Sequence, residues 1–225
     1  MTAPQGIHPF TVVLATHNMH KVKEIMAIFH DVPITFLTLD KFPGAPDVVE
    51  DGKTLEENAQ KKAYEIAKFT KHISLADDSG LEVDFLDGAP GVISARFAGA
   101  GCSFADNNNK LLKLMKGVPT EHRKARFRSV MALAVPDGAT QTVEGALDGY
   151  ITDRARGEEG FGYDPVFLVP DPGKTLAELG PQLKNNLSHR FKALQAMRPV
   201  LLKLRDNIQQ HLGKQHLPGT PTDII

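Results

Sequence analysis

The sequence has little of several features that would narrow its function at once. It holds one cysteine, Cys102, which excludes an internal disulfide and a zinc cluster built on cysteines. Its formal net charge of −1 excludes a global attraction to nucleic acid or to an anionic membrane. No apolar run approaches the roughly 20 residues of a membrane span, and residues 1–9 lack the basic and apolar regions of a secretion signal. We therefore expect a cytoplasmic protein that binds neither nucleic acid nor membrane.

The composition is that of a folded enzyme-sized chain. With 225 residues, 41% of them hydrophobic, the chain can form one large α/β domain or two closely joined lobes. A chain of this size buries roughly 70–75% of its unfolded surface. We expect a single domain over residues 10–212, preceded by a short extension at 1–9 and followed by a polar, flexible tail at 213–225.

Apolar periodicity predicts alternating strands and helices in the first half of the chain. Residues 10–15 (FTVVLA) form a short apolar run typical of a buried strand. The apolar spacing of Val22, Ile25, Met26 and Phe29 then predicts a helix. Further predicted elements are a helix over 54–69 that begins with Thr54 and Glu57 at capping-box spacing, a buried strand over 73–76 and a short strand over 81–85.

The second half is predicted to contain a hairpin and a long final helix. Ser103 and Asp106 have capping-box spacing ahead of a helix that reaches about residue 115. Strands over 124–135 and 140–147 are predicted to pair around the turn at 136–138. Another strand follows over 166–169. The last helix begins near Ser188 and runs past residue 204, and Pro199 predicts a kink or two abutting helices.

The first candidate site is Thr16-x-Asn18-x-x-Lys21, between the first strand and the first helix. A helix N-terminus offers free N–H groups and partial positive charge, both suited to phosphate. Thr16 and Asn18 add hydrogen-bonding groups, and Lys21 lies one turn into the helix. The alternative is that Asn18 only caps the helix and Lys21 is solvated. The GxxxxGK[ST] pattern of a P-loop is absent.

The second candidate is Asp77-Asp78-Ser79-Gly80, which follows the strand predicted over 73–76. Ligands of open α/β sheets bind beyond the carboxyl ends of strands. Paired acids there are suitable ligands for Mg²⁺, and one of them can take a proton from water. The alternative is a turn in which Asp and Ser satisfy loop amides. The acids Glu50 and Asp51 offer a further metal ligand or form a solvated loop.

Two further clusters lie in the second half of the chain. In GFGYDP (160–165), glycines permit close approach of a ligand, aromatic rings can stack on a base, and Asp164 can accept a hydrogen bond. The alternative is a hairpin turn with a core Phe. Lys184 and Ser188-His189-Arg190 suit anionic and keto oxygens, or belong to an ordinary basic helix start. His17 and His20 have i, i+3 spacing, but with no third soft ligand nearby we do not favour zinc there.

Taken together, these segments resemble the inosine triphosphate pyrophosphatase family. The resemblance runs from about Phe10 to Leu204 and is carried by VVLATHNMHKVKEI, GKTLEENAQKKA, LADDSGLEVDFLDGAPGVISARFAG, GFGYDPVF and LSHRFKAL in that order. Each segment alone is weak, whereas ADDSGL, GFGYDPVF and SHR in succession are specific. The resemblance implies an elongated two-lobed α/β protein with a mixed sheet and a central substrate cleft, usually a homodimer.

The same resemblance implies an activity. Members of this family hydrolyse ITP, dITP and XTP to the monophosphate and pyrophosphate with Mg²⁺, and so keep these nucleotides out of DNA and RNA. Asp78 would bind the metal and accept a proton, Glu50 would assist with the metal, and Lys21 and Lys62 would offset phosphate charge. The residues implied to contact the substrate are Thr16, His17, Asn18, Met19, His20, Lys21, Ser79, Phe161, Gly162, Tyr163, Asp164, Lys184, His189 and Arg190.

Two rival functions remain open from the sequence. A related pyrophosphatase acting on modified pyrimidine or methylated nucleotides would use the same phosphate chemistry. A nucleotide-binding regulatory module would bind without turnover. His17 stands where the family usually has Gly. This departure bears on substrate specificity more than on catalytic activity.

Overall fold

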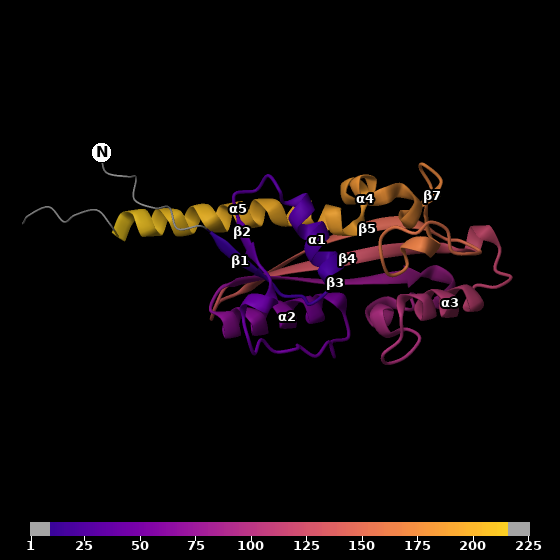
Figure 1. The fold of residues 1–225 in the computed structure, drawn as a ribbon, viewed down its shortest axis with the longest axis horizontal. Coiled ribbons are helices and arrows are strands. Elements are labelled where there is room, and N and C mark those ends of the chain that lie inside the picture. The colour runs from indigo at the N-terminus through magenta and orange to yellow at the C-terminus, as the bar shows by residue number, and fades with distance from the viewer. Residues whose placement is uncertain (1–9, 216–225) are drawn as a thin grey trace, which may run out of the picture.

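The computed structural model describes residues 10–215 of the chain (Figure 1). The predicted extension at 1–9 and residues 216–225 of the predicted tail lie outside the described residues. The last helix continues to Gln215, past the residue at which the tail was expected to begin. Within residues 10–215, no helix is long and apolar enough to cross a membrane.

One seven-stranded mixed sheet runs along the elongated molecule (Figure 1). Its order is β2-β1-β3-β4-β5-β6-β7. The strand β1 is parallel to β2 and β3, and every later pairing is antiparallel. The strands are β1 (Thr11–Leu14), β2 (Thr35–Leu37), β3 (Ile73–Val83), β4 (Lys124–Ala134), β5 (Thr140–Ile151), β6 (Phe167–Val169) and β7 (Lys174–Thr175). This architecture confirms the expected mixed α/β class.

Helices cover both faces of the sheet. They are α1 (Met19–Ile28), α2 (Leu55–Thr70), α3 (Phe104–Leu114), α4 (Leu176–Leu187) and α5 (His189–Gln215). A first core cluster packs α1 and α5 against Leu75 and Met131, and a second packs α2 against Ala76 and Ala132. Because neighbouring residues of a strand point to opposite faces, α1 and α5 lie on one face of the sheet and α2 lies on the other.

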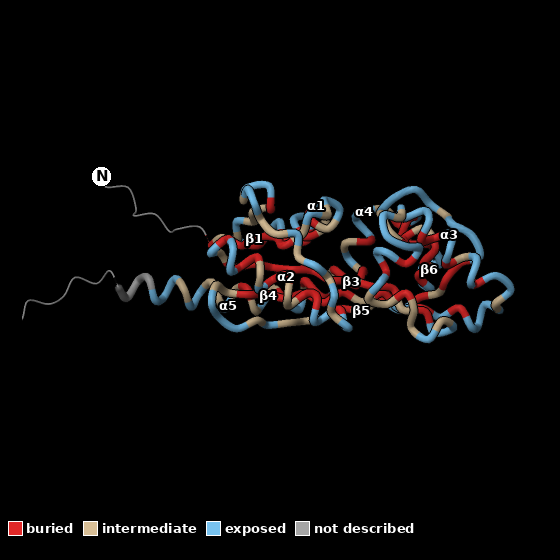
Figure 2. Tube along the Cα trace, turned by 90° about the horizontal axis from the view of Figure 1, so that it is seen from below, coloured by how far each residue is buried: buried red, intermediate tan, exposed pale blue. Residues whose placement is uncertain are grey.

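A third core cluster fills the far end of the sheet, where Leu81 and Phe127 pack with residues of α3, α4 and β6. Figure 2 shows the buried residues following the sheet along the length of the molecule. Along β3, the first two clusters reach Leu75 and Ala76, and the third begins at Leu81. The candidate site lies over the polar segment between them.

Several predicted helix starts are confirmed. The side chain of Asn18 caps α1, that of Thr54 caps α2, and Ser103 with Asp106 forms the predicted capping box of α3. The helix α5 continues through Pro199 as one element, so two abutting helices are not found. Proline removes one backbone hydrogen bond, and burial of Met197 and Leu201 on either side of it supports the helix there.

The helix α4 was not predicted from the sequence. It contains Gly180, with a positive φ of 74°, followed by Pro181. Both residues normally mark a turn. The capping box of Thr175 and Glu178 begins the helix, and the backbone kinks at Gly180, where its φ and ψ are not helical.

The prediction for β3 was wrong in one respect that matters for the site. The strand does not end before Asp77-Asp78-Ser79-Gly80 but passes through it, because β4 pairs with it from Ser74 to Val83. It is β1 that ends here, since its last residue Leu14 lies opposite Leu75. The acidic segment therefore lies beyond the carboxyl end of the neighbouring strand and in the middle of its own.

Candidate active site

A cavity of about 270 Å³ lies over the middle of β3. It gathers most of the predicted site residues, which come from both halves of the chain. The predicted residues that line it are Thr16, His17, Asn18, Lys21, Glu50, Lys62, Asp78, Ser79, Phe161, Gly162, Tyr163, Asp164, Lys184, His189 and Arg190. Met19 and His20 do not line it. Met19 is exposed, and the His20 ring stacks on Phe161 with 5.1 Å between ring centroids.

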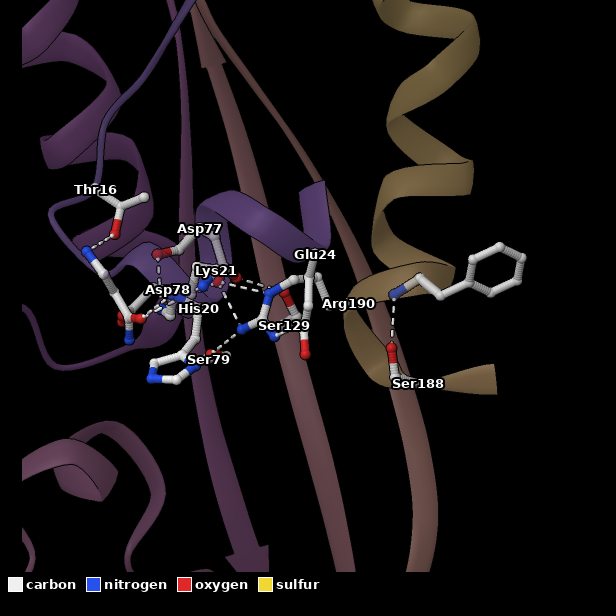
Figure 3. Close-up of polar contacts among 12 residues, drawn as sticks. Thr16, His20, Lys21, Glu24, Asp77, Asp78, Ser79, Ser129, Ser188 and Arg190 are labelled. Atoms are coloured by element: carbon white, nitrogen blue, oxygen red, sulfur yellow. Dashed lines mark hydrogen bonds and ion pairs between the residues drawn. The ribbon is translucent and has the colours of Figure 1, made fainter. Parts of the chain in front are cut away.

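The turn between β1 and α1 is held by its own side chains (Figure 3). Thr16 Oγ1 accepts from the Asn18 amide at 3.1 Å, and Asn18 Oδ1 accepts from the His20 amide at 2.9 Å. Asn18 therefore does cap the helix. Lys21, however, is not solvated, because its Nζ lies 3.0 Å from Asp77 Oδ2. Burial lowers the pKa of Lys21 against the attraction of Asp77.

The two acids of Asp77-Asp78 point to opposite faces of the sheet. Asp77 contacts Lys21 and Arg190 on the face covered by α1 and α5. Asp78 contacts Lys62 on the face covered by α2. The expectation that these adjacent acids act as a pair is therefore wrong, because strand geometry separates their side chains.

Asp77 is a fully satisfied buried carboxylate. Its Oδ2 accepts from Arg190 Nη2 at 2.8 Å and Nε at 3.1 Å, and its Oδ1 accepts from Ser129 Oγ at 2.6 Å (Figure 3). Burial by itself would raise the pKa of Asp77, but Arg190, Lys21 and Ser129 together hold it well below its usual range. This carboxylate stays ionised and has no capacity to act as a base.

Asp78 is only partly satisfied. Its Oδ1 lies 3.1 Å from Lys62 Nζ, while its Oδ2 is buried without a hydrogen-bond partner. Burial raises the pKa of Asp78, against the opposing attraction of Lys62 and Lys21. A carboxylate of raised pKa with a free oxygen is suited to accept a proton or to bind a cation.

Lys62 joins Asp78 to Glu50. Its Nζ lies 2.6 Å from Glu50 Oε1 and donates to the Asp77 carbonyl at 2.8 Å. Burial opposes the charged form of Lys62, but attraction by Asp78 and Glu50 outweighs it and raises the pKa of this lysine. The turn that carries Glu50 is tied to α2 by Asn58 Oδ1, which accepts from the Gly52 amide at 2.8 Å.

The carboxylates of Asp78 and Glu50 fit a divalent cation. Both carboxylates contact Lys62 Nζ and are therefore close to each other, and Asp78 Oδ2 has no hydrogen-bond partner. Carboxylate oxygens are the ligands that Mg²⁺ prefers, and this ion keeps several waters and bridges to phosphate. In residues 10–215, no group of three or more His, Cys, Asp and Glu side chains is placed to hold an ion. Water and phosphate oxygens would therefore complete the shell around two protein ligands.

The other end of the cavity carries the 160–165 segment. Asp164 Oδ2 accepts from Lys184 Nζ and from the Phe161 amide, at 2.5 and 2.8 Å. A Cβ at Gly160 would lie 2.1 Å from the same oxygen, so only glycine fits there. Lys184 Nζ also lies 4.6 Å from the centroid of the Phe161 ring. Burial raises the pKa of Asp164, although Lys184 opposes this.

His189 and Arg190 begin α5 and are both buried. Ser188 Oγ accepts from the Phe191 amide at 3.1 Å and fixes this start (Figure 3). The His189 ring stacks on Phe127 at 4.6 Å, and its Nδ1 has no hydrogen-bond partner. Burial, followed by the charge of Arg190, lowers the pKa of His189 well below 6.5, so the imidazole is neutral at pH 7. Arg190 donates hydrogen bonds to Asp77, Glu24 and Ser79.

Three residues that contact the site residues were missed from the sequence. Glu24 accepts from both Lys184, at 2.7 Å, and Arg190. Its position three residues after Lys21 on one helix face was an available signal. Ser129 bonds to Asp77 only through the register of β3 and β4, for which the sequence gives no signal. Asn108 Nδ2 donates to the Gly162 carbonyl at 3.0 Å and ties α3 to the 160–165 segment.

This arrangement suits an anionic ligand with an aromatic end. Lys21, Lys62, Lys184 and Arg190 converge on one cavity, although the whole chain is nearly neutral. The two lysines beside Asp78 lie at the end that suits phosphate. Phe161 and neutral His189 lie at the end that suits a planar base.

Comparison with known proteins identifies relatives over most of the chain. The family model described as the Ham1 family matches residues 12–200. A dITP/XTP pyrophosphatase of Geobacter sulfurreducens is 51% identical, covering 91% of this chain and 97% of the relative. One of Desulforamulus reducens is 50% identical, covering 86% and 96%. The structure of a HAM1 protein from Coxiella burnetii, 40% identical, superposes with a TM-score of 0.79 over 86% of this chain and 99% of that one.

Proposed function

The chain belongs to the Ham1 family, and from this premise we propose that it hydrolyses non-standard purine nucleoside triphosphates to the monophosphate and pyrophosphate. ITP, dITP and XTP are the proposed substrates, in keeping with relatives named dITP/XTP pyrophosphatase. One observation carries the proposal. The buried Lys62 and the partly buried Lys21 act on a carboxylate with a free oxygen, in a cavity whose other end holds an aromatic ring and a neutral imidazole.

We propose Mg²⁺ as the cofactor, with Asp78 and Glu50 as its protein ligands. When bound, this ion neutralises phosphate charge and favours ionisation of a water molecule. The two carboxylates also keep Lys62 in place through bonds of 2.6 and 3.1 Å. Asp78 and Glu50 would thus bind the metal ion and hold Lys62 in position.

In the proposed reaction, water attacks the α-phosphorus and pyrophosphate leaves. Asp78 takes the proton of the attacking water, because its raised pKa and free Oδ2 make it the stronger base of the two adjacent acids. Lys21 and Lys62 offset the charge that develops on the leaving group. The free N–H groups at the start of α1 add to the positive potential there.

Selection of the base is proposed to depend on hydrogen bonding at O6 of the purine. Hypoxanthine and xanthine present an acceptor there, which suits a donor from His189 or Arg190. Adenine presents a donor and would leave buried groups unpaired, a mismatch that is strongly selective. Because Arg190 already donates to Asp77, Glu24 and Ser79, we propose His189, which lines the same cavity, as the donor to O6. Guanine shares O6, so rejection of GTP would depend on its 2-amino group.

The wider setting belongs to the same proposal. Residues 10–212 would act as one domain of two lobes around the cavity, as a homodimer in the cytoplasm. There the enzyme would remove non-standard nucleotides before they are incorporated into DNA and RNA.

The test is a substrate panel of ITP, dITP, XTP, GTP and ATP, with and without Mg²⁺, with separate detection of pyrophosphate and of phosphate. We expect pyrophosphate from the first three nucleotides only, and loss of turnover when a chelator is added. Release of single phosphates, or turnover that a chelator leaves unchanged, would contradict the proposal. Turnover confined to modified pyrimidine or methylated nucleotides would favour the related pyrophosphatase. Binding without turnover would favour a regulatory module.

A further inference from the structure

Asp77 lies where groups from both ends of the cavity meet. Its carboxylate contacts Lys21 at 3.0 Å and Arg190 at 2.8 Å. Arg190 in turn contacts Glu24, which contacts Lys184, which contacts Asp164. A continuous series of buried and partly buried ion pairs therefore joins the lysine at the phosphate end to the acid at the base end, and Asp77 is its junction.

The backbone of Asp77 adds a second junction. The Leu75 carbonyl accepts from the Ala15 amide at 2.9 Å. Every second carbonyl of β3, counted from Leu75, therefore points toward β1. Two residues further on, β1 has ended. The Asp77 carbonyl faces that open edge and accepts from Lys62 Nζ at 2.8 Å and from Lys21 Nζ at 3.3 Å. Lysines that come from opposite faces of the sheet meet on one atom.

The side chain of Asp77 cannot serve the chemistry directly. It is buried, and both of its oxygens are already bonded to Ser129, Arg190 and Lys21. What it can do is fix the position of Lys21 relative to Arg190. Without it, the two cations that now share its Oδ2 would be close neighbours with no negative charge between them.

We propose that Asp77 is a positioning residue that sets the spacing between the phosphate-binding Lys21 and the base-side Arg190. This inference rests on the proposed function. A substrate held at its base by the α5 end of the cavity then presents its α-phosphate at the distance where Lys21 and Asp78 act. Asp77 also competes with the triphosphate for Lys21, so it weakens ground-state binding while it orders the reacting groups.

The Asp77→Asn variant separates positioning from a merely structural role. We expect kcat for ITP to fall about 10²-fold, the size of loss that a small misplacement of a reacting group causes. We expect KM for ITP to fall several-fold, together with the Kd of inorganic tripolyphosphate measured by calorimetry without metal, because the competing charge is gone. Unchanged kcat, or weaker tripolyphosphate binding, would overturn the proposal.

Ser129→Ala is the matched control, since it removes a bond to Asp77 and leaves the carboxylate with Lys21 and Arg190. We expect its kcat and tripolyphosphate Kd to match the parent within about twofold. A loss of kcat as large as that of Asp77→Asn would overturn the proposal, because packing would then be the cause.

A charge-balanced variant keeps the test available if Asp77→Asn does not fold. In Asp77→Asn/Lys21→Met, the lysine that Asp77 positions is also absent, so kcat should equal that of Lys21→Met within about twofold. A further tenfold loss would show that Asp77 does not act through Lys21. If the parent releases no pyrophosphate from any proposed substrate, the proposed function fails. The tripolyphosphate measurement still decides whether Asp77 competes for Lys21.

Discussion

The two faces of β3 hold adjacent acids in very different surroundings. On the face covered by α1 and α5, Asp77 has a partner on each oxygen, and its pKa lies well below the usual range because Arg190, Lys21 and Ser129 outweigh burial. On the face covered by α2, Asp78 keeps one oxygen unpartnered, and burial raises its pKa. Asp77 is thus a structural anion and Asp78 a reactive one, although they are neighbours on the same strand.

The comparison shows that the two faces of one short segment of β3 have different roles. The saturated face is rigid, because each charge is fixed by an opposite charge and by burial. The α2 face leaves capacity for a metal ion, a water molecule and a phosphate. A search for clustered acids in the sequence finds both residues but does not show which one is reactive. Their hydrogen-bond partners in the structure do show this.

The strongest way to break this comparison is to neutralise the reactive acid. Asp78→Asn should lower kcat for ITP about 10³-fold, because the proton acceptor and a metal ligand are lost together. Its free energy of unfolding should change by less than about 1 kcal/mol, since Lys62 keeps Glu50 at 2.6 Å. Turnover at the parental rate, measured as pyrophosphate release, would remove Asp78 from the mechanism.

Neutralising the saturated acid should lower the free energy of unfolding as well as kcat. Asp77→Asn leaves the buried Arg190 and Lys21 short of a counter-charge, which typically costs about 3–5 kcal/mol. Urea denaturation of the two Asn variants side by side measures the contrast. A loss for Asp77→Asn no larger than that for Asp78→Asn would mean that the faces do not differ as described.

A smaller effect is expected for the neutral imidazole on the Asp77 face. His189→Phe keeps a ring to stack on Phe127 and removes the nitrogen proposed to bond to the base. The ratio of kcat/KM for ITP to that for ATP should fall about tenfold, the value of one unmade bond to a buried group. An unchanged ratio in the substrate panel would assign base selection to other residues.

The smallest effect concerns pH and the same side chain. Burial lowers the pKa of His189 well below 6.5, so the unfolded chain binds a proton that the folded one excludes. Stability from this group is present above pH 6.5 and is lost as pH falls toward the folded pKa. The loss is about 1 kcal/mol between pH 6.5 and 5.5. Denaturation of His189→Phe should lack this part of the pH dependence, and identical slopes would contradict it.

The sequence predicts the phosphate end of the site better than the network behind it. Asn18 caps a helix directly after a strand, so residue spacing alone places Lys21 near the strand end. Asp77 and Asp78 form part of a recognisable motif, but their division between faces follows from continuous pairing with β4, which local pattern does not reveal. Ser129 enters only through that register.

Other residues escaped prediction because local signals pointed elsewhere. Gly180 and Pro181 are typical of a turn and concealed α4, which carries Lys184. Glu24 was one polar residue among several on α1, and its two cationic partners lie about 160 residues away in the chain. The spacing from Lys21 places Glu24 on the same helix face, but its pairing with Lys184 and Arg190 depends on tertiary packing, which short-range periodicity does not reveal.

The carbonyl on which Lys21 and Lys62 meet belongs to the main chain, and every amino acid that a codon for position 77 can specify would supply it. Point mutation can change the charge beside the lysines but cannot delete this acceptor. Extending β1 would delete it, since pairing continued as far as the His17 amide would occupy the Asp77 carbonyl. Over evolutionary time, insertions in the turn after β1 should therefore be tolerated less readily than substitutions at position 77.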